Sequence, residues 1–339
     1  MSQRISKDTI LLTNAPSILA SAAVVGKKEG EGPLARHFDI IFDDTTLGEE
    51  TWEKSESKMQ KSAVEKALEK ASLSSAEIQL LFAGDLLNQC ISSSYGLRDF
   101  DIPFYGLYGA CSTMTESLGL ASLFADNGLL DYGIAVTSSH FCSAERQFRL
   151  PLEYGGQRPP TSQWTVTGSG AAIVGQSANP PYVRAVTIGK IIDLGIKDIN
   201  NMGAAMAPAA HNTIKTFLQD TGTKPEDYDL ILTGDLGKVG SDLLIDLLKH
   251  DQIDLSGIHQ DCGKLIYDLE TQDVHAGGSG CGCCASVLCS YVLKRIQEGV
   301  LHNVLVIATG ALMSTTSFQQ GESIPGIAHL VHLSDSKGS

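Results

Sequence analysis

The chain contains an internal duplication, and this duplication fixes the order in which its secondary-structure elements follow one another. Residues 59–86 align without gaps with residues 209–236, and both segments end in Gly-Asp-Leu. Apolar side chains fall at matching places in the two copies: Val64, Ala67 and Leu68 in the first, Ile214, Phe217 and Leu218 in the second. Each copy therefore predicts a helix, a turn and a buried strand.

The repeat continues through the rest of each copy. Residues 127–139 resemble residues 298–310, and the two copies close on apolar strands at 168–175 and 325–333. The repeated unit is β-α-β-α-β-β, with an N-terminal half at 1–178 and a C-terminal half at 179–339. Two such units predict an α/β fold of five layers, αβαβα, with pseudo-twofold symmetry. The alternative is a chance similarity of two ordinary α/β segments.

The two halves differ by an insertion, which the repeat places at residues 140–163 in the first half. It reads HFCSAERQFRLPLEYGGQRPPTSQ and holds three of the eight arginines of the chain: Arg146, Arg149 and Arg158. The aromatic residues Phe141, Phe148, Tyr154 and Trp164 lie within or beside it. This is a local basic and aromatic cluster in a chain of net charge −14.

Composition excludes several classes of protein. A net charge of −14 argues against a nucleic-acid partner, because Lys and Arg are outnumbered by Asp and Glu. No signal peptide and no apolar run long enough to cross a membrane are expected. Five of the eight cysteines lie between Cys262 and Cys289. We interpret them as reduced, closely packed thiols of a cytosol-like compartment, and their spacing does not favour a structural zinc site.

The segment YGACSTMTESLGLA, residues 108–121, sets Cys111 in a small-residue turn directly before a predicted helix. The amides and dipole of a helix N-terminus favour a thiolate and can hold an anion, which suits a nucleophile. A small buried cysteine in a tight turn is the equally weighted alternative. The repeat places residues 277–288 opposite this turn, so the predicted site lies between the two halves.

Four segments resemble, in order, the nucleophile turn and the later motifs of the thiolase and ketoacyl-synthase superfamily: YGACSTMTES, NMGAAMAPA, TGTKPEDYDLILTGDLG and HAGGSGCGCCA. Members of this superfamily carry histidine or asparagine at two later positions, which activate the thiol and stabilise the oxyanion or enolate. Here these positions fall at Thr233-Gly234-Asp235 and at Gly277-Gly278. A carboxylate would repel the charge that develops in the reaction, so the resemblance implies the fold without the chemistry.

Two longer segments, which contain Cys111 and the insertion, resemble a thiolase-like sporulation family of Firmicutes, the stage V sporulation AD family. This resemblance implies a non-catalytic protein that binds dipicolinic acid, either free or as its calcium chelate, for uptake into the developing spore. It further implies the membrane proteins of the same operon as partners, a peripheral place at the forespore inner membrane, and a homodimer. No cofactor and no bound metal of the protein's own are expected.

A flat aromatic dianion such as dipicolinate needs fixed positive charge and an apolar face. The residues expected to contact it are Cys111, Ser112, His140, Arg146, Arg149, Arg158, Asp235, Gly277 and Gly278. The alternative for the arginines is ion pairing with Glu145 and Glu153. Asp85 and Asp235 are interpreted chiefly as caps of the helices that follow them, with pocket proximity for Asp235 as the second possibility.

Two other functions remain open from the sequence. One is an acyltransferase acting on acyl-CoA thioesters through Cys111, with His275 or His140 as the base. The other is a structural scaffold of a membrane transport complex.

Overall fold

The computed structural model describes residues 2–148 and 158–338 and shows two similar runs of five strands. The first run is β6-β5-β7-β9-β3: Phe104–Gly106, Leu80–Gly84, Tyr132–Ser139, Gly168–Gly175 and Ser17–Gly26. The second is β12-β11-β14-β15-β10: His259–Asp261, Leu230–Thr233, Asn303–Ala311, Gly326–Ser334 and Tyr182–Thr187. In each run the first three strands are parallel and the last two pair antiparallel.

The two runs touch where Tyr182 of β10 pairs with Ser17 of β3. Short strands extend this arrangement: β1 (Gln3–Arg4), β2 (Thr9–Leu11), β4 (Ile40–Phe42), and the separate pair β8 (Trp164–Thr165) and β13 (Gly278–Ser279). The strand β7 is buried along nearly its whole length, as expected for a parallel strand covered on both faces.

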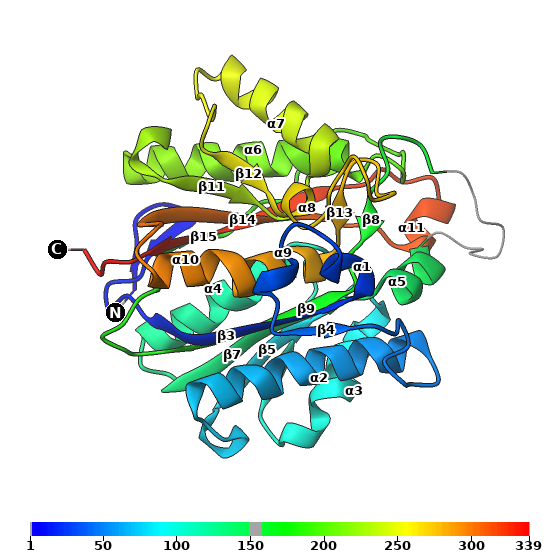
Figure 1. Cartoon of the computed structure of the whole chain (residues 1–339). Coiled ribbons are helices and arrows are strands. Elements are labelled where there is room, and N and C mark those ends of the chain that lie inside the picture. Colours follow the sequence, from blue (N-terminus) through cyan, green and yellow to red (C-terminus); the bar gives the residue numbers. More distant parts are fainter. Residues whose placement is uncertain (1, 149–157, 339) are drawn as a thin grey trace.

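Helices form three layers around the two runs of strands (Figure 1). On the outer faces lie α2 (Trp52–Ala71) with α3 (Ile91–Leu97), and α6 (Met202–Thr221) with α7 (Gly237–His250). Between the sheets lie α4 (Thr113–Asp126) and α9 (Cys281–Val287), the latter continued by a π-helical turn, Leu288–Val292, into α10 (Leu293–Gln297). The remaining helices are short: α1 (Lys27–Gly30), α5 (Phe141–Phe148), α8 (Cys262–Leu265) and α11 (Thr315–Gln319).

The five-layer αβαβα fold expected from the duplication is therefore confirmed. The helices α2 and α6 start and end at matching residues of the two copies, as do the starts of β5 and β11. The structure adds to each half a helix and a short strand that the predicted unit left out, namely α3 with β6 and α7 with β12. Three buried clusters of apolar residues fill the spaces between the five layers.

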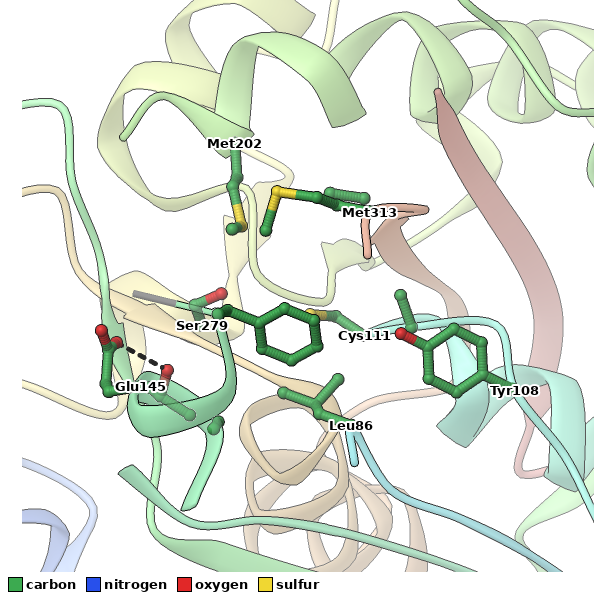
Figure 2. A pocket seen from close by; sticks show the side chains of 12 residues that line it. Leu86, Tyr108, Cys111, Glu145, Met202, Ser279 and Met313 are labelled. Carbon is green, nitrogen blue, oxygen red and sulfur yellow. Dashed lines mark hydrogen bonds between the residues drawn. The ribbon is translucent and has the colours of Figure 1, made fainter. Parts of the chain in front are cut away.

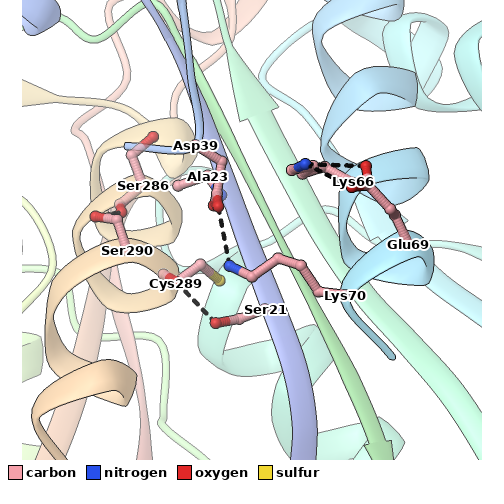
Figure 3. A network of polar contacts seen from close by, with 9 residues as sticks. All are labelled: Ser21, Ala23, Asp39, Lys66, Glu69, Lys70, Ser286, Cys289 and Ser290. Atoms are coloured by element: carbon pink, nitrogen blue, oxygen red, sulfur yellow. Dashed lines mark hydrogen bonds and ion pairs between the residues drawn. The ribbon is translucent and has the colours of Figure 1, made fainter. Parts of the chain in front are cut away.

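Hydrogen bonds and an ion pair connect three of these layers around β3 of the first half (Figure 3). Asp39 accepts a hydrogen bond from the amide of Ala23 on β3 at 2.9 Å and pairs with Lys70 of α2 at 3.0 Å. Also from β3, the Ser21 hydroxyl donates to the carbonyl of Cys289 in the central layer at 2.7 Å. The strand is thus tied to an outer helix and to the central helices at once.

The turn before α4 has an unusual backbone conformation, and a strand of the second half packs closely against it. Ala110 has φ = 50°, in the left-handed region that non-glycine residues seldom adopt. Gly310 of β14 lies against this turn, and a Cβ atom on Gly310 would come within 2.3 Å of the carbonyl oxygen of Gly109. The absence of a side chain at Gly310 therefore lets the second half approach the turn that carries Cys111.

We expect Gly310→Ala to lower the free energy of unfolding by roughly 1–3 kcal/mol, because the new methyl group must displace backbone. Gly119→Ala in α4 is the matched control. Its Cβ would make ordinary contact at 3.4 Å with Val186, and alanine favours a helix. Urea unfolding of both variants measures the difference, and equal stabilities would contradict the close approach.

Candidate functional site

A pocket opens directly above Cys111 (Figure 2). Both halves and the insertion contribute to its wall: Leu86, Tyr108, Ala110, Cys111, Ala144, Glu145, Phe148, Thr165, Met202, Ser279, Ala311 and Met313. The helix α5 of the insertion supplies Ala144, Glu145 and Phe148, and the start of α6 supplies Met202. The pocket is therefore walled mainly by apolar and aromatic side chains, as small-molecule sites are.

Cys111 forms the floor of the pocket and is only 6% exposed. Its thiol lies beside the buried carboxylate of Asp235 and interacts with it electrostatically. Burial, and then the negative charge of Asp235, raise the pKa of the Cys111 thiol well above its usual value. Cys111 is therefore a neutral thiol at physiological pH, and it faces a carboxylate where a nucleophile would need a base.

Asp235 lies behind Cys111 and is fully buried. Its carboxylate accepts hydrogen bonds from the amide of Gly280 at 2.8 Å, from the Ser279 hydroxyl at 3.1 Å and from the Thr309 hydroxyl at 2.8 Å. Burial raises the pKa of Asp235 to about 6, and the hydrogen bonds oppose this rise. The group is therefore mostly ionised at pH 7, which keeps Cys111 protonated.

The duplicated aspartates have different surroundings. Asp85 accepts hydrogen bonds from the amide of Leu87 at 2.9 Å and from the amide of Ser93, in the first turn of α3, at 2.8 Å. It caps the helix that follows, as expected. Asp235 instead lies beside the pocket, which is the second of the two possibilities that the sequence left open.

Of the other residues expected at the site, three hold the backbone around it. The Ser112 hydroxyl donates to the Gly109 carbonyl at 2.6 Å and starts α4. Gly278 pairs with Trp164 between β13 and β8, and its carbonyl accepts from the Gln163 amide at 2.7 Å. Gly277 precedes it with φ = 114°. The two glycines place Ser279 at the pocket wall, and neither they nor Ser112 are among the described residues that line it.

The described basic residues of the insertion make their contacts outside the pocket lining. His140 Nε2 lies 2.7 Å from the carbonyl oxygen of Thr45, and burial lowers the pKa of its imidazole. Arg146 pairs with Glu53 and lies 5.3 Å from the centre of the Trp52 ring.

Arg158 pairs with Asp273 at 3.2 Å and lies 4.5 Å from the centre of the Trp164 ring. Arg149, Glu153 and Tyr154 fall outside the described residues. Arg146 and Arg158 thus form ion pairs, as the alternative expected, and their partners among the described residues are Glu53 and Asp273.

The two histidines considered as catalytic bases make their contacts elsewhere. His140 faces the Thr45 carbonyl, and His275 sits in a left-handed turn, with φ = 51° and its Nε2 3.4 Å from Asp273. The twelve described residues that line the pocket include no histidine, lysine or arginine. Within the described part of the chain, the pocket lining therefore offers Cys111 no histidine, lysine or arginine side chain.

Sequence reasoning missed most of the pocket wall. Ser279 was one residue beyond the predicted Gly277-Gly278 position, and the repeat could have found it, since it precedes α9 as Cys111 precedes α4. Tyr108 and Met202 lie within the segments that carry the superfamily resemblance. Met313 comes just after β14, and no pattern in the sequence marks it.

All eight cysteines are free thiols, and Cys262 and Cys284 share a hydrogen bond in the core. In the described ranges, no group of three or more His, Cys, Asp or Glu side chains could hold a metal ion. Nor does any helix in those ranges have the length and apolar character needed to cross a membrane.

We expect Asp235→Asn to make Cys111 more reactive, because removal of the neighbouring negative charge lowers the pKa of the thiol. At pH 8 the rate of alkylation by iodoacetamide should rise several-fold for Cys111, measured by peptide mass spectrometry. The half-buried Cys142 is the internal control, and its rate should stay the same. An unchanged rate at Cys111 would show that the carboxylate does not control the thiol.

Comparisons with known proteins agree with this geometry. Among solved structures, 3-oxoacyl-[acyl-carrier-protein] synthase III from Aquifex aeolicus is 14% identical with a TM-score of 0.57, over 94% of this chain and all of its own. Cerulenin-bound OleA from Xanthomonas campestris is 15% identical with a TM-score of 0.60, over 94% of this chain and 96% of its own. At these identities the likeness shows the thiolase-like fold alone.

Sequence comparison is more specific. Stage V sporulation protein AD of Bacillus subtilis is 46% identical over 323 residues, which cover 95% of each chain. The family model of stage V sporulation protein AD matches residues 6–334. The chain therefore belongs to the stage V sporulation protein AD family and has a thiolase-like fold.

Proposed function

We propose that this sporulation protein is a non-catalytic member of the thiolase-like fold that binds dipicolinic acid and takes part in its uptake into the developing spore. The observation that carries the proposal is the buried Cys111 thiol beside the Asp235 carboxylate, at the floor of a largely apolar pocket. The ligand itself comes from the resemblance to the sporulation family, and the charges of the pocket bear on its form.

The arrangement around Cys111 favours binding over acyl transfer. A thiol whose pKa is raised by burial and by Asp235 is a poor nucleophile. Asp235 is also hydrogen-bonded to the amide of Gly280, which a catalytic site would use to stabilise an oxyanion. The thiol of Cys111 and the amide of Gly280, which would take part in acyl transfer, thus both interact with Asp235.

The acidic group beneath the pocket favours a ligand without net negative charge. The buried Asp235 carboxylate lies directly behind Cys111. Its negative charge opposes the binding of a free pyridine dicarboxylate dianion. The 1:1 calcium chelate carries no net charge, and calcium accepts further carboxylate and hydroxyl oxygens as ligands. We therefore propose that the pocket takes dipicolinate as its calcium chelate.

The shape and polarity of the pocket suit such a ligand. Tyr108 and Phe148 supply aromatic rings to the wall, and Met202 and Met313 cover the space above Cys111 (Figure 2). Aromatic and thioether side chains pack well against a flat ring. On the side of α5, Glu145 accepts a hydrogen bond from Thr165 at 3.1 Å, so polar oxygens gather at one end of the pocket.

We expect isothermal titration to show calcium-dependent binding of dipicolinate that is weakened at least about tenfold in Ala144→Phe, because the new ring fills the pocket. Arg146→Gln should bind as the wild type does, since this guanidinium lies on Glu53 and Trp52. Spores that carry Ala144→Phe should hold less dipicolinic acid, whereas a pure scaffold would leave the content unchanged.

Two results would contradict the proposal. One is calcium-dependent binding that is equally tight in the wild type and in Ala144→Phe. The other is an acetyl adduct on intact protein after incubation with acetyl-CoA that is lost in Cys111→Ser, which would identify an acyltransferase.

We propose that the protein acts beside the membrane proteins encoded with it, at the forespore inner membrane, and that it is a homodimer. The edge strand β6 supports the dimer. It ends the first run of strands, and its side chains Phe104 and Tyr105 are 39% and 51% exposed. An edge of this kind, bearing exposed aromatic side chains, is suited to antiparallel pairing with the same strand of a second copy.

We expect Tyr105→Lys to shift the protein from dimer to monomer, because a charged side chain on an edge strand opposes pairing. Leu129→Lys is the matched control, since Leu129 is a similarly exposed apolar residue away from β6. Sedimentation velocity distinguishes the two species. A wild-type monomer, or a dimer that survives Tyr105→Lys, would contradict this interface.

A further inference from the structure

A second groove, of about 860 Å³, lies between the edge of the second half and the segment that follows β15. The strand β10 contributes Arg184, β15 contributes His332, and the end of α6 contributes Phe217. Tyr228 and Lys337 complete its principal wall. The described lining of this groove contains no Asp or Glu, although the chain has a net charge of −14.

The two cations of the groove lack acidic partners in the described part of the chain. Arg184 donates a hydrogen bond from Nη1 to the carbonyl oxygen of Ser336 at 3.0 Å, and burial alone lowers the pKa of its guanidinium. Lys337 Nζ lies 5.1 Å from the centre of the Tyr182 ring. Many other cations of the chain face a carboxylate, such as Lys190 with Asp8 at 2.6 Å. Arg184 and Lys337 instead leave uncompensated positive charge in one cavity.

His332 adds an unsatisfied polar atom to the same cavity. Its Nε2 is buried and has no hydrogen-bond partner within the described residues. Burial, and then the charge of Arg184, lower the pKa of the imidazole to about 4, so the ring is neutral at pH 7 and can donate from Nε2. A buried polar atom without a partner is uncommon in a native structure and calls for an acceptor.

Hydroxyl groups and rings form the rest of the wall. The Tyr228 hydroxyl lies 2.9 Å from that of Thr223, which lies 2.7 Å from that of Thr221. The rings of Tyr228 and Phe217 stand edge-on to His332, at 5.5 Å and 6.0 Å between centroids. The groove therefore combines the Arg184 guanidinium, the exposed ammonium of Lys337, a buried imidazole nitrogen and a row of hydroxyls.

We propose that this groove is a binding site for a small dianion, either a dicarboxylate or a phosphate group, held by Arg184, Lys337 and His332. A guanidinium and an ammonium beside a buried donor are the groups that recognise carboxylate and phosphate oxygens. The groove is separate from the Cys111 pocket and differs from it in charge, so each of the two can be tested independently.

Isothermal titration in the presence of EDTA tests the site, with inorganic phosphate and calcium-free dipicolinate as separate probes. We expect at least one probe to bind at one equivalent per chain and to weaken at least about tenfold in Arg184→Gln and in Lys337→Gln. Preference for phosphate or for dipicolinate identifies which class of dianion the groove selects. Binding should persist in Ala144→Phe, which blocks only the Cys111 pocket.

Arg98→Gln is the matched control. Arg98 lies over the Tyr95 ring, as Lys337 lies over the Tyr182 ring, but it is on the surface of the first half. Lys337→Gln is the second variant in case Arg184→Gln fails to fold. Lys337 lies in the segment after β15 and its ammonium contacts the Tyr182 ring, so its substitution should leave the fold intact. The proposal is overturned if neither probe binds at concentrations up to about 1 mM, or if both substitutions leave binding unchanged.

Discussion

The carboxylate of Asp235 connects the pocket floor of the first half to the second half. It accepts hydrogen bonds from Gly280 and Ser279 at the start of α9 and from Thr309 on β14, and it lies beside the Cys111 thiol of the first half. Since the group is fully buried, its charge is tolerable only while these donors surround it. The position of the Cys111 turn, and hence of the pocket floor, depends on this one group.

The duplication explains why two buried aspartates exist and why only one reaches the pocket. Asp85 uses its oxygens on the start of α3, and its charge, after burial, helps to raise the pKa of Glu56 to about 8. At the start of α7, the helix that follows Asp235, Asp261 instead accepts the amides of Leu236 and Gly237. Asp235 accepts the amide of Gly280 at the start of α9, beside the pocket. The two duplicated aspartates therefore differ in the helix whose start they contact.

The sequence alone was sufficient to predict the fold and to identify Cys111, the residue at the floor of the pocket. Periodicity and the repeat identify α2, α6 and the buried strands, because these depend on local apolar patterns. The wall of the pocket depends on contacts between distant segments, such as Met202, Met313 and Phe148, which no local pattern marks. The partners of the basic residues in the insertion were not predictable for a similar reason. Charge in sequence does not say which acid lies opposite, and Arg146 and Arg158 pair with the distant Glu53 and Asp273.

The two cavities differ in the charge of the groups around them, and they therefore differ in the ligands that they can accept. Behind Cys111 the buried Asp235 carboxylate opposes a ligand of net negative charge. Around Arg184 the charged groups of the described lining are cationic, so a ligand there must bring negative charge. A dicarboxylate that exchanges between its free and calcium-bound forms changes net charge by two. Under the two proposals made above, such a ligand favours the Arg184 groove when free and the Cys111 pocket when chelated.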